Sequence, residues 1–359
     1  MRAKANSINK HQMVFIEDDA LFPSTRFQGS KLKIVDWIWD TLCELDFDSA
    51  LDAFGGTGSV AYMLKYKGKQ VTYNDMLQFN WYIGTALIEN SQTKLTDNEI
   101  DFLLRRHESI QYPTFIYDTF KDIYFADEEN RWLDMVVTNI DLIDDFYKKA
   151  VAYFALFQAC IIKRPFNLFH RKNLYIRFSD VKRNFGNKTT WDTPFEVHFR
   201  QFVHEANQAV FSNGQQNTAL NSDAFDIEGD FDLVYIDTPY ISQKGVGVDY
   251  LGFYHFLEGL VNYSKWPDMI DYRTKHRRLK GTDSVWTDKN KIMPAFDRLF
   301  DKFKNSILVV SYRSDGIPSI TELAALLKKY KSEVEELKRT DYKYVLSTNQ
   351  SEEVLLIGK

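Results

Sequence analysis

The order of apolar and polar residues in the first quarter of the chain predicts helices that alternate with short buried strands. Apolar residues recur at helical spacing in two segments and form short continuous runs in two others. In chain order these patterns predict a helix over 31–45, a strand over 50–54, a helix over 59–67 and a strand over 70–73. A strand, a helix and a second strand in this order form a βαβ unit, which is how a doubly wound parallel sheet begins.

This alternation fades at about residue 93 and resumes near residue 220. Helical patterns occupy the stretch between, over 98–107, 140–160 and 194–211. Later apolar runs predict strands at 233–236, 306–311 and 353–357, and a long irregular loop over 241–290. We therefore predict an α/β fold with a Rossmann-like sheet domain, made of 21–92 and 216–359, and a mostly helical insert over 93–215.

The composition predicts a large core. Of the 359 residues, 44% are apolar and 15% are aromatic, which is enough for one large domain or two ordinary ones. The net charge of −5 argues against a nonspecific nucleic-acid coat, but not against a local binding face. The sequence has no signal peptide and no apolar run of about 18 residues, so we expect a soluble, cytoplasmic protein without a membrane partner.

Cysteine and histidine give no sign of a metal site. Cys43 and Cys160 lie far apart in apolar, helix-like segments. We therefore expect two buried free thiols rather than a disulfide or a pair of zinc ligands. The histidines lack the spacing of ligand pairs, so we assign them structural or surface roles and expect no metal.

The tetrapeptide Asp237-Thr238-Pro239-Tyr240 follows the apolar strand 233–236 and is the main candidate for chemistry. Ligands of open α/β sheets bind at the carboxyl ends of the strands, where this tetrapeptide falls. Its carboxylate and a backbone carbonyl suit the two N–H bonds of an exocyclic amine, and its ring suits stacking on a flat base. The simpler interpretation is a strand end with a turn that begins at an aspartate.

A glycine turn suits a cofactor that contains adenosine. Asp52 and Phe54 precede Gly55, Gly56 and Gly58 at a strand-to-helix turn, where glycine lets a ligand approach the backbone. The spacing is neither GxGxxG nor that of a phosphate-binding loop, which disfavours NAD, FAD and nucleoside triphosphates. A dinucleotide, S-adenosylmethionine or no ligand at all are each compatible with the turn by itself.

Two further aspartates follow predicted strands. Asp75 ends the second strand, where it would accept bonds from ribose hydroxyls or simply cap the next helix. Asp223, which precedes Ala224, is either an acceptor for an adenine amino group or a loop residue.

In chain order, these motifs resemble those of the DNA adenine methylase family, the alpha-class N6-adenine methyltransferases that use S-adenosylmethionine. Phe27 and Lys31 look like that family's aromatic–x–Gly–x–Lys segment. Segment 309–319 is similar to a late strand and loop of the family, and 342–344 with 353–357 looks like its closing hairpin. The similarity covers most of the chain outside the helical insert. It implies a methyltransferase sheet whose insert is the target-recognition domain.

The resemblance implies a site-specific, adenine-specific DNA methyltransferase whose cofactor is S-adenosylmethionine. It implies that the cofactor is held by Phe27, Lys31, Asp52, Phe54, Gly55, Gly56, Gly58, Asp75, Asp223 and Ala224. The implied catalytic residues are Asp237, Thr238, Pro239 and Tyr240. Thr238 and Ala53 stand where the family usually has proline. Thr238 still supplies a backbone carbonyl, so we expect only some preorganisation to be lost there while Pro239 keeps the rest, and we expect Ala53 to change loop stiffness only.

In the implied mechanism, Asp237 and the Thr238 carbonyl accept the two N–H bonds of the target amine and aim its lone pair at the methyl group. Asp237 is expected to be an acceptor rather than a strong base, because the nitrogen becomes acidic only after methylation. The target base must leave the duplex to reach the site, and Tyr240 would hold it by stacking.

Two basic segments are expected to contact DNA. Between residues 163 and 188 the cations, with aromatic residues between them, face a single acid, Asp180. From this segment we assign DNA contacts to Arg171, Lys172, Asn173, Arg177, Lys182, Arg183 and Lys188. The run 273–280 follows the tetrapeptide and adds Arg277 and Arg278. For both segments the alternative is a solvated, charged surface.

Duplex DNA is the expected partner, and a cognate restriction endonuclease would be a second partner in a restriction–modification system. An orphan or phage-borne methylase would have the same sequence features. One alternative is a methyltransferase that acts on an amine of RNA or on a protein glutamine, and the basic insert favours DNA over both. The other alternative is a noncatalytic DNA-binding relative. The intact Asp237 and glycine turn argue against it.

Overall fold

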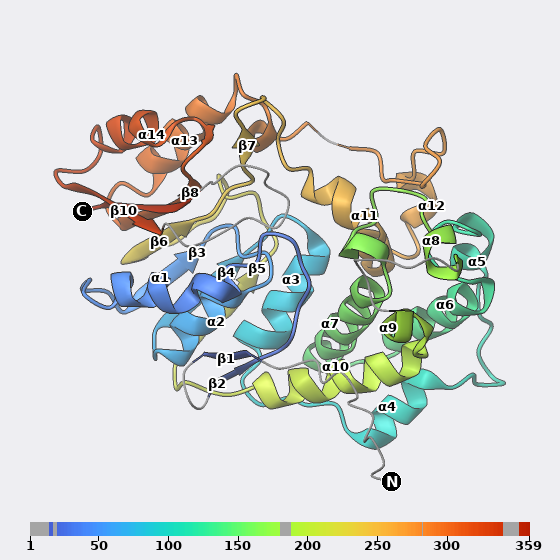
Figure 1. The fold of residues 1–359 in the computed structure, drawn as a ribbon. Coiled ribbons are helices and arrows are strands. Elements are labelled where there is room, and N and C mark those ends of the chain that lie inside the picture. The colour runs from blue at the N-terminus through green and yellow to red at the C-terminus, as the bar shows by residue number, and fades with distance from the viewer. Residues whose placement is uncertain (1–13, 17–19, 180–187, 282, 340–351) are drawn as a thin grey trace, which may run out of the picture.

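The structure, a computed structural model, describes residues 14–16, 20–179, 188–281, 283–339 and 352–359 (Figure 1). Its centre is a seven-stranded sheet. The strand order is β10 (Val334–Arg339), β11 (Glu353–Gly358), β8 (Ile307–Arg313), β6 (Leu233–Ile236), β3 (Ser49–Asp52), β4 (Gln70–Asn74) and β5 (Thr218–Leu220). The strands from β8 to β5 run parallel, and β11 runs antiparallel to both of its neighbours. Of the predicted Rossmann-like α/β fold, the mixed α/β character and the mostly parallel central sheet are confirmed.

Each face of the sheet is covered by its own helices (Figure 1). Leu51 and Val310 belong to an apolar cluster with α13 (Ile292–Lys302) and α14 (Ile320–Leu327). Ala50 and Val309 belong to the other cluster, which includes residues of α1 (Val35–Leu42), α2 (Ser59–Tyr66) and α3 (Gln78–Gly84). Adjacent residues join different clusters because successive side chains on a strand point to opposite faces. The sheet therefore lies between two layers of helices.

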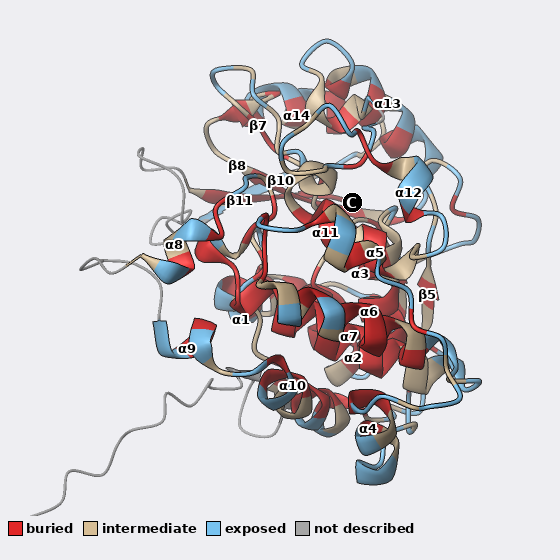
Figure 2. Cartoon of the chain, turned by 90° about the vertical axis from the view of Figure 1, so that its right-hand side faces the viewer, coloured by how far each residue is buried: buried red, intermediate tan, exposed pale blue. Residues whose placement is uncertain are grey.

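The described part of 93–215 contains helices and no strand. These are α4 (Asp97–Leu104), α5 (Phe115–Thr119), α6 (Asp127–Asp141), α7 (Phe146–Ile162), η3 (Pro165–Asn167), α8 (Tyr175–Phe178), α9 (Lys188–Asp192) and α10 (Phe195–Ala209). Helix α7 is buried along most of its length and packs against α3 and the π-helical turn η2 (Thr85–Glu89) (Figure 2). The helical run therefore shares the apolar core of the sheet domain.

Three local predictions are wrong. The helix expected over 140–160 is interrupted, because α6 ends at Asp141 and α7 begins at Phe146 after Asp145, whose Oδ1 accepts the Lys148 N–H at 3.0 Å. The stretch 241–290, expected to be irregular, contains α11 (Tyr250–Val261), α12 (Trp266–Met269) and η4 (Val285–Thr287). Cys160 is buried as expected, but Cys43 is exposed because it follows the last buried residue of α1.

Two small antiparallel pairs complete the described structure. Strand β7 (Ile241–Ser242) begins directly after Tyr240 and pairs with β9 (Gly316–Ile317), which ties the tetrapeptide to the loop after β8. Strands β1 (Val14–Ile16) and β2 (Ala20–Phe22) form the other pair, and the turn η1 (Leu32–Ile34) leads into α1. Among the described helices, none has the length and apolar character needed to cross a membrane.

Candidate active site

The candidate site lies at the carboxyl ends of the neighbouring strands β3 and β6. These strands are parallel neighbours, but the sheet continues to β4 on the side of β3 and to β8 on the side of β6. At such a switch point the loops after the strands turn in opposite directions and leave a crevice for a ligand. Asp52 ends β3 and Asp237 directly follows β6, so two predicted site residues meet here.

Lys31 reaches Asp237 from a segment 206 residues earlier in the chain. Its Nζ lies 2.9 Å from Oδ1 and 2.7 Å from Oδ2 of Asp237, and 2.6 Å from the Tyr240 hydroxyl oxygen. The Tyr240 hydroxyl donates in turn to Oδ1 of Asp237 at 2.7 Å. The structure thus joins residues from the first and the last predicted motif in one network.

Sequence reasoning missed Glu353, the fourth member of this network, at the start of β11. Its Oε1 accepts from the Tyr240 hydroxyl at 3.1 Å and from Ser311 Oγ at 2.5 Å, and lies 3.8 Å from Lys31 Nζ. Its side chain is 0% exposed. The available signal was an acid directly before the apolar run 354–357, because a carboxylate that is buried with such a run needs a partner.

Burial and neighbouring charges shift the pKa values in this network. Burial opposes the charge on Lys31, but the carboxylates of Asp237 and Glu353 outweigh it and raise the pKa of the amine. The pKa of Asp237 is also raised, because burial and the charge of Glu353 together outweigh Lys31. Burial, followed by the charges of Asp237 and Asp75, raises the pKa of Asp52 to about 8. Among the described residues this cluster of charges therefore holds more carboxylates than cations.

The glycine turn after β3 combines positive backbone angles with one close side-chain contact, and both favour glycine. Gly56 and Gly58 have φ values of +50° and +75°, in the region that favours glycine. A Cβ on Gly55 would lie 2.1 Å from the ring of Tyr73. Oδ2 of Asp75 accepts the Gly56 N–H at 3.0 Å, and burial raises the pKa of Asp75 to about 6. The predicted turn and Asp75 therefore form one structural unit.

Comparison with known families settles what kind of protein this site belongs to. Residues 27–258 match the model of the D12 class N6 adenine-specific DNA methyltransferases, which is more than half of the chain. The chain belongs to this family. The matched range begins at Phe27 and includes Lys31, the glycine turn and the tetrapeptide, but it ends before β8 and β11.

Curated relatives of this D12-class enzyme are type II methylases. Type II methyltransferase M2.HphI of Haemophilus parahaemolyticus is 31% identical over 86% of this chain and 88% of its own length. Type II methyltransferase M.FokI of Planomicrobium okeanokoites and modification methylase StsI of Streptococcus sanguinis are each 26% identical. The matches cover 85% and 84% of this chain, which spans 47% and 45% of those two relatives.

In this D12-class enzyme, α11 holds the predicted Phe27 segment. The rings of Phe27 and Tyr254 stack with centroids 4.1 Å apart and planes 9° from parallel. The Gln28 N–H donates to the Tyr254 hydroxyl at 2.7 Å. Because Phe27 is itself buried, its direct contact with the cofactor stays a prediction.

The predicted Asp223 segment lies beside the end of β4. Asn74 Nδ2 donates to the Ser222 carbonyl, and the Ser222 N–H donates to Asn74 Oδ1, both at 3.1 Å. Asp223 is exposed and accepts the Phe225 N–H at 3.0 Å, whereas Ala224 is buried. The end of β4 and the Asp223 turn are therefore held side by side.

Trp286 forms an aromatic wall that sequence reasoning also missed. Its ring packs edge-on against Phe54 at 5.1 Å and stacks on Phe225 at 5.5 Å. The wall links the predicted Phe54 to the 223–225 turn. Trp286 lies in η4, inside the stretch expected to be an irregular loop. The only sequence signal for it was a single aromatic residue in that part of the loop.

The residues predicted to contact DNA divide into surface and interior groups. Exposed are Arg171, Lys172, Lys188 and Arg278, and Arg277 is half-buried with its Nη1 donating to the Tyr272 carbonyl at 2.7 Å. Asn173 and Arg177 are buried. Arg177 pairs with both oxygens of Glu129, at 2.6 and 2.8 Å, and Lys163 approaches the same carboxylate at 2.9 Å. Lys182 and Arg183 lie outside the described residues.

Buried Arg164 shapes the loop between α7 and α8. Its guanidinium donates to the carbonyls of Tyr124, Leu168 and Arg171 at 3.0–3.3 Å and to Asn173 Oδ1. Burial lowers its pKa to about 9. Three exposed aromatic residues stand on or beside this loop, namely Phe166, Tyr175 and Phe178. The predicted basic segment therefore presents rings and cations from a loop that a buried arginine holds in shape.

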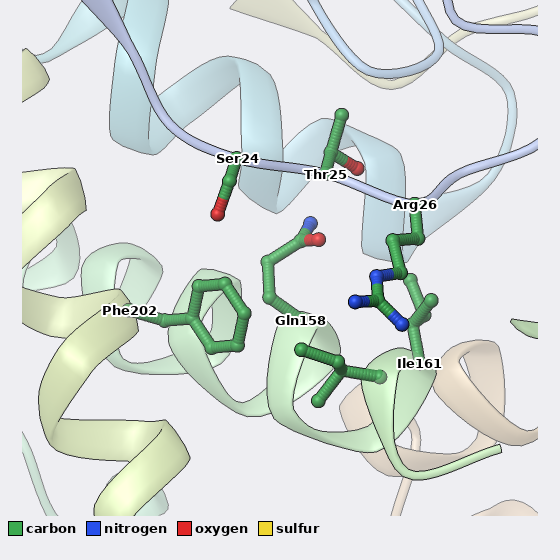
Figure 3. A pocket seen from close by; sticks show the side chains of 7 residues that line it. Ser24, Thr25, Arg26, Gln158, Ile161 and Phe202 are labelled. Carbon is green, nitrogen blue, oxygen red and sulfur yellow. The ribbon is translucent and has the colours of Figure 1, made fainter. Parts of the chain in front are cut away.

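A cavity of about 190 Å³ lies beside the segment that precedes Phe27 (Figure 3). It is lined by Ser24, Thr25, Arg26, Gln158, Ile161, Ile162 and Phe202. The Gln158 amide points from α7 toward the backbone of 24–26. None of the lining residues belongs to the Lys31 network, and none was predicted as a site residue.

Proposed function

We propose that this D12-class enzyme moves a methyl group from S-adenosylmethionine to N6 of adenine in duplex DNA, as the modification enzyme of a type II system. The observation that carries the proposal is the Lys31–Asp237–Tyr240 network at the switch point of the sheet, in a chain that matches the D12 model. M2.HphI and M.FokI are type II methyltransferases, so the partner we propose beside DNA is a cognate restriction endonuclease.

Charge supports S-adenosylmethionine as the cofactor. Asp52, Asp75 and Asp237 lie close enough for their charges to interact, and Oδ1 of Asp52 is buried without a hydrogen-bond partner among the described residues. A ligand with a sulfonium and an ammonium group would offset this excess of carboxylate. The proposed cofactor residues are Phe27, Lys31, Asp52, Phe54, Gly55, Gly56, Gly58, Asp75, Asp223 and Ala224. Bound there, the cofactor supplies an electrophilic methyl group.

Asp237 and the Thr238 carbonyl prepare the target amine in the proposed mechanism. The lone pair of adenine N6 is delocalised into the ring, which makes the amine a weak nucleophile. When Asp237 and the Thr238 carbonyl accept its two N–H bonds, the nitrogen becomes pyramidal and its lone pair points out of the ring plane. After methylation the nitrogen carries an acidic proton, which passes to the Asp237 carboxylate or to water.

Lys31 and Tyr240 hold Asp237 for this role. Lys31 contacts both carboxylate oxygens, so it fixes the orientation of the acceptor without using all of its lone pairs. The Tyr240 ring packs edge-on against Tyr312 at 5.1 Å and is only 7% exposed. Lys31 Nζ lies over the same ring, 5.0 Å from its centroid, so a flipped base would stack on Tyr240 only after side chains around the ring move.

Methylation of defined DNA tests the proposed function. The chain is incubated with labelled S-adenosylmethionine and duplex DNA, and single-molecule sequencing then locates the modified adenines. We expect label in DNA and N6-methyladenine within one recurring sequence. The same substrate methylated beforehand, and an RNA duplex of the same sequence, are the controls. Label in RNA or in protein but not in DNA would contradict the proposal.

We further propose that the 93–215 segment recognises the target and that its exposed basic loop contacts the duplex. Cations neutralise backbone phosphates, and the exposed rings of Phe166, Tyr175 and Phe178 stand among them. Arg171, Lys172, Lys188, Arg277 and Arg278 are the proposed contacts among the described residues, with Lys182 and Arg183 proposed from sequence. Buried Asn173 and Arg177 would act by holding the loop.

Surface and interior cations are expected to behave differently on mutation. Arg171→Ala or Lys172→Ala should weaken DNA binding, and each should lower the slope of log affinity against log salt by about 1. Arg177→Gln is the matched interior variant, and it should lower thermal stability because Glu129 loses its bidentate partner. Fluorescence anisotropy of a labelled duplex at several salt concentrations measures the slopes. A slope that changes only in Arg177→Gln would contradict this division.

A further inference from the structure

We infer that Glu353 is a positioning residue for methyl transfer, because it offers the Tyr240 hydroxyl a second acceptor and so frees Asp237 to receive the target amine. The inference rests on the proposed function. It concerns a residue of β11, which lies beyond the range that matches the family model.

The Tyr240 hydroxyl stands between two carboxylates. It lies 2.7 Å from Oδ1 of Asp237 and 3.1 Å from Oε1 of Glu353. A phenol has one proton to donate, so it can serve only one of the two at a time. Lys31 Nζ, 2.6 Å from the phenol oxygen, donates to it and leaves its proton directed at the carboxylates. The geometry is that of a hydrogen bond that can pass from one carboxylate to the other.

Binding of the target amine changes which acceptor suits the phenol. In the free enzyme, Asp237 Oδ1 receives both the Tyr240 hydroxyl and Lys31. An incoming adenine amino group needs a lone pair on the same carboxylate. If the phenol turns to Glu353, one lone pair of Asp237 is released and no buried donor is left unsatisfied.

Contacts with other residues hold the Glu353 carboxylate near the Tyr240 hydroxyl. Ser311 Oγ on the neighbouring strand β8 donates to the same Oε1 at 2.5 Å. The carboxylate is fully buried and 3.8 Å from Lys31 Nζ, so one lysine lies between Asp237 and Glu353. Lys31 therefore acts as the counter-charge of both carboxylates, with its shorter contacts to Asp237.

The charge of Glu353 should also affect how methyl transfer depends on pH. The groups that face Asp237 are Lys31 from the 27–31 segment, Tyr240, Glu353 from β11, Asp52 from β3 and Tyr235 from β6. Asp237 accepts the amine only when ionised, so kcat/KM should fall as the pH drops through its pKa. Glu353 raises that pKa, and its neutralisation should therefore move the acid limb to lower pH.

Glu353→Gln tests both parts of the inference. We expect kcat to fall about 10- to 100-fold, with KM for DNA and the Kd for S-adenosylmethionine changed less than about threefold. The acid limb of kcat/KM should move down by about one pH unit. Ser311→Ala is the matched control, because it removes one bond to Glu353 but keeps the charge, and its acid limb should coincide with that of the wild type.

A shortened carboxylate gives an independent test should Glu353→Gln not fold. Glu353→Asp keeps the charge but withdraws it from Tyr240 by one methylene group. It should keep the wild-type acid limb and lose kcat, and a Glu353→Asp enzyme with wild-type kcat would overturn the inference. So would Glu353→Gln with an unmoved acid limb and active wild-type enzyme, a result that leaves the proposed function standing. Wild-type enzyme inactive on adenine would overturn both.

Discussion

Asp237→Asn is expected to reduce methyl transfer by at least about 10³-fold while S-adenosylmethionine still binds. The asparagine side chain has the same shape, but it replaces one acceptor oxygen with an NH₂ group that donates. That donor would face the amine of the target base, and the remaining oxygen would be uncharged. Asp237→Ala should be equally inactive, because it removes the acceptor entirely. Single-turnover transfer of labelled methyl groups to a duplex measures the rate.

The fold is expected to survive this change because Lys31 keeps a carboxylate partner. Glu353 Oε1 lies 3.8 Å from Lys31 Nζ, so the buried amine is not left without a counter-charge. Calorimetric titration with S-adenosylmethionine and thermal unfolding separate loss of chemistry from loss of structure. Asp230→Asn, at an exposed position in the loop before β6, is the control and should stay fully active. An active Asp237→Asn or Asp237→Ala enzyme would contradict the catalytic assignment.

The sequence predicts the part of the site that short-range patterns determine. Apolar runs locate β3, β4 and β6, and a parallel sheet places the residues after such strands at a common edge. Asp52 and Asp237 could therefore be assigned to one crevice. That Lys31 belongs beside them came from the resemblance to a family, because nothing in its own segment indicates a partner 206 residues away.

The rest depends on long-range packing that local patterns do not encode. Glu353 enters the network only because β11 pairs antiparallel with β8, a pairing that its apolar run does not specify. Because cations are usually exposed, a sequence pattern alone assigns Lys163, Arg164 and Arg177 to a surface patch. Their burial depends on Glu129 and on carbonyls of other segments, which are not adjacent in sequence.

Lys31→Met is expected to destabilise the fold by about 3–5 kcal/mol at pH 8 and to abolish activity. Methionine fills the volume of the lysine stem but leaves Asp237 and Glu353 buried together without their shared cation. The loss should depend on pH. Lys31 lowers the pKa of Asp237, so in its absence this pKa rises further above the value in the unfolded chain. A carboxyl whose pKa is raised on folding stabilises the folded state at pH values below its pKa in the unfolded chain. That contribution is lost as the pH rises through its pKa in the folded state.

The deficit of Lys31→Met relative to the wild type should therefore be small near pH 5 and grow toward pH 8, as measured by urea unfolding at several pH values. Adding Glu353→Gln should restore part of the stability, because one of the two repelling charges is removed, although activity should not return. Lys33→Met, at an exposed position two residues away, should change stability by less than about 0.5 kcal/mol. A Lys31→Met deficit that is independent of pH, or that Glu353→Gln worsens, would mean that packing rather than charge is what Lys31 contributes.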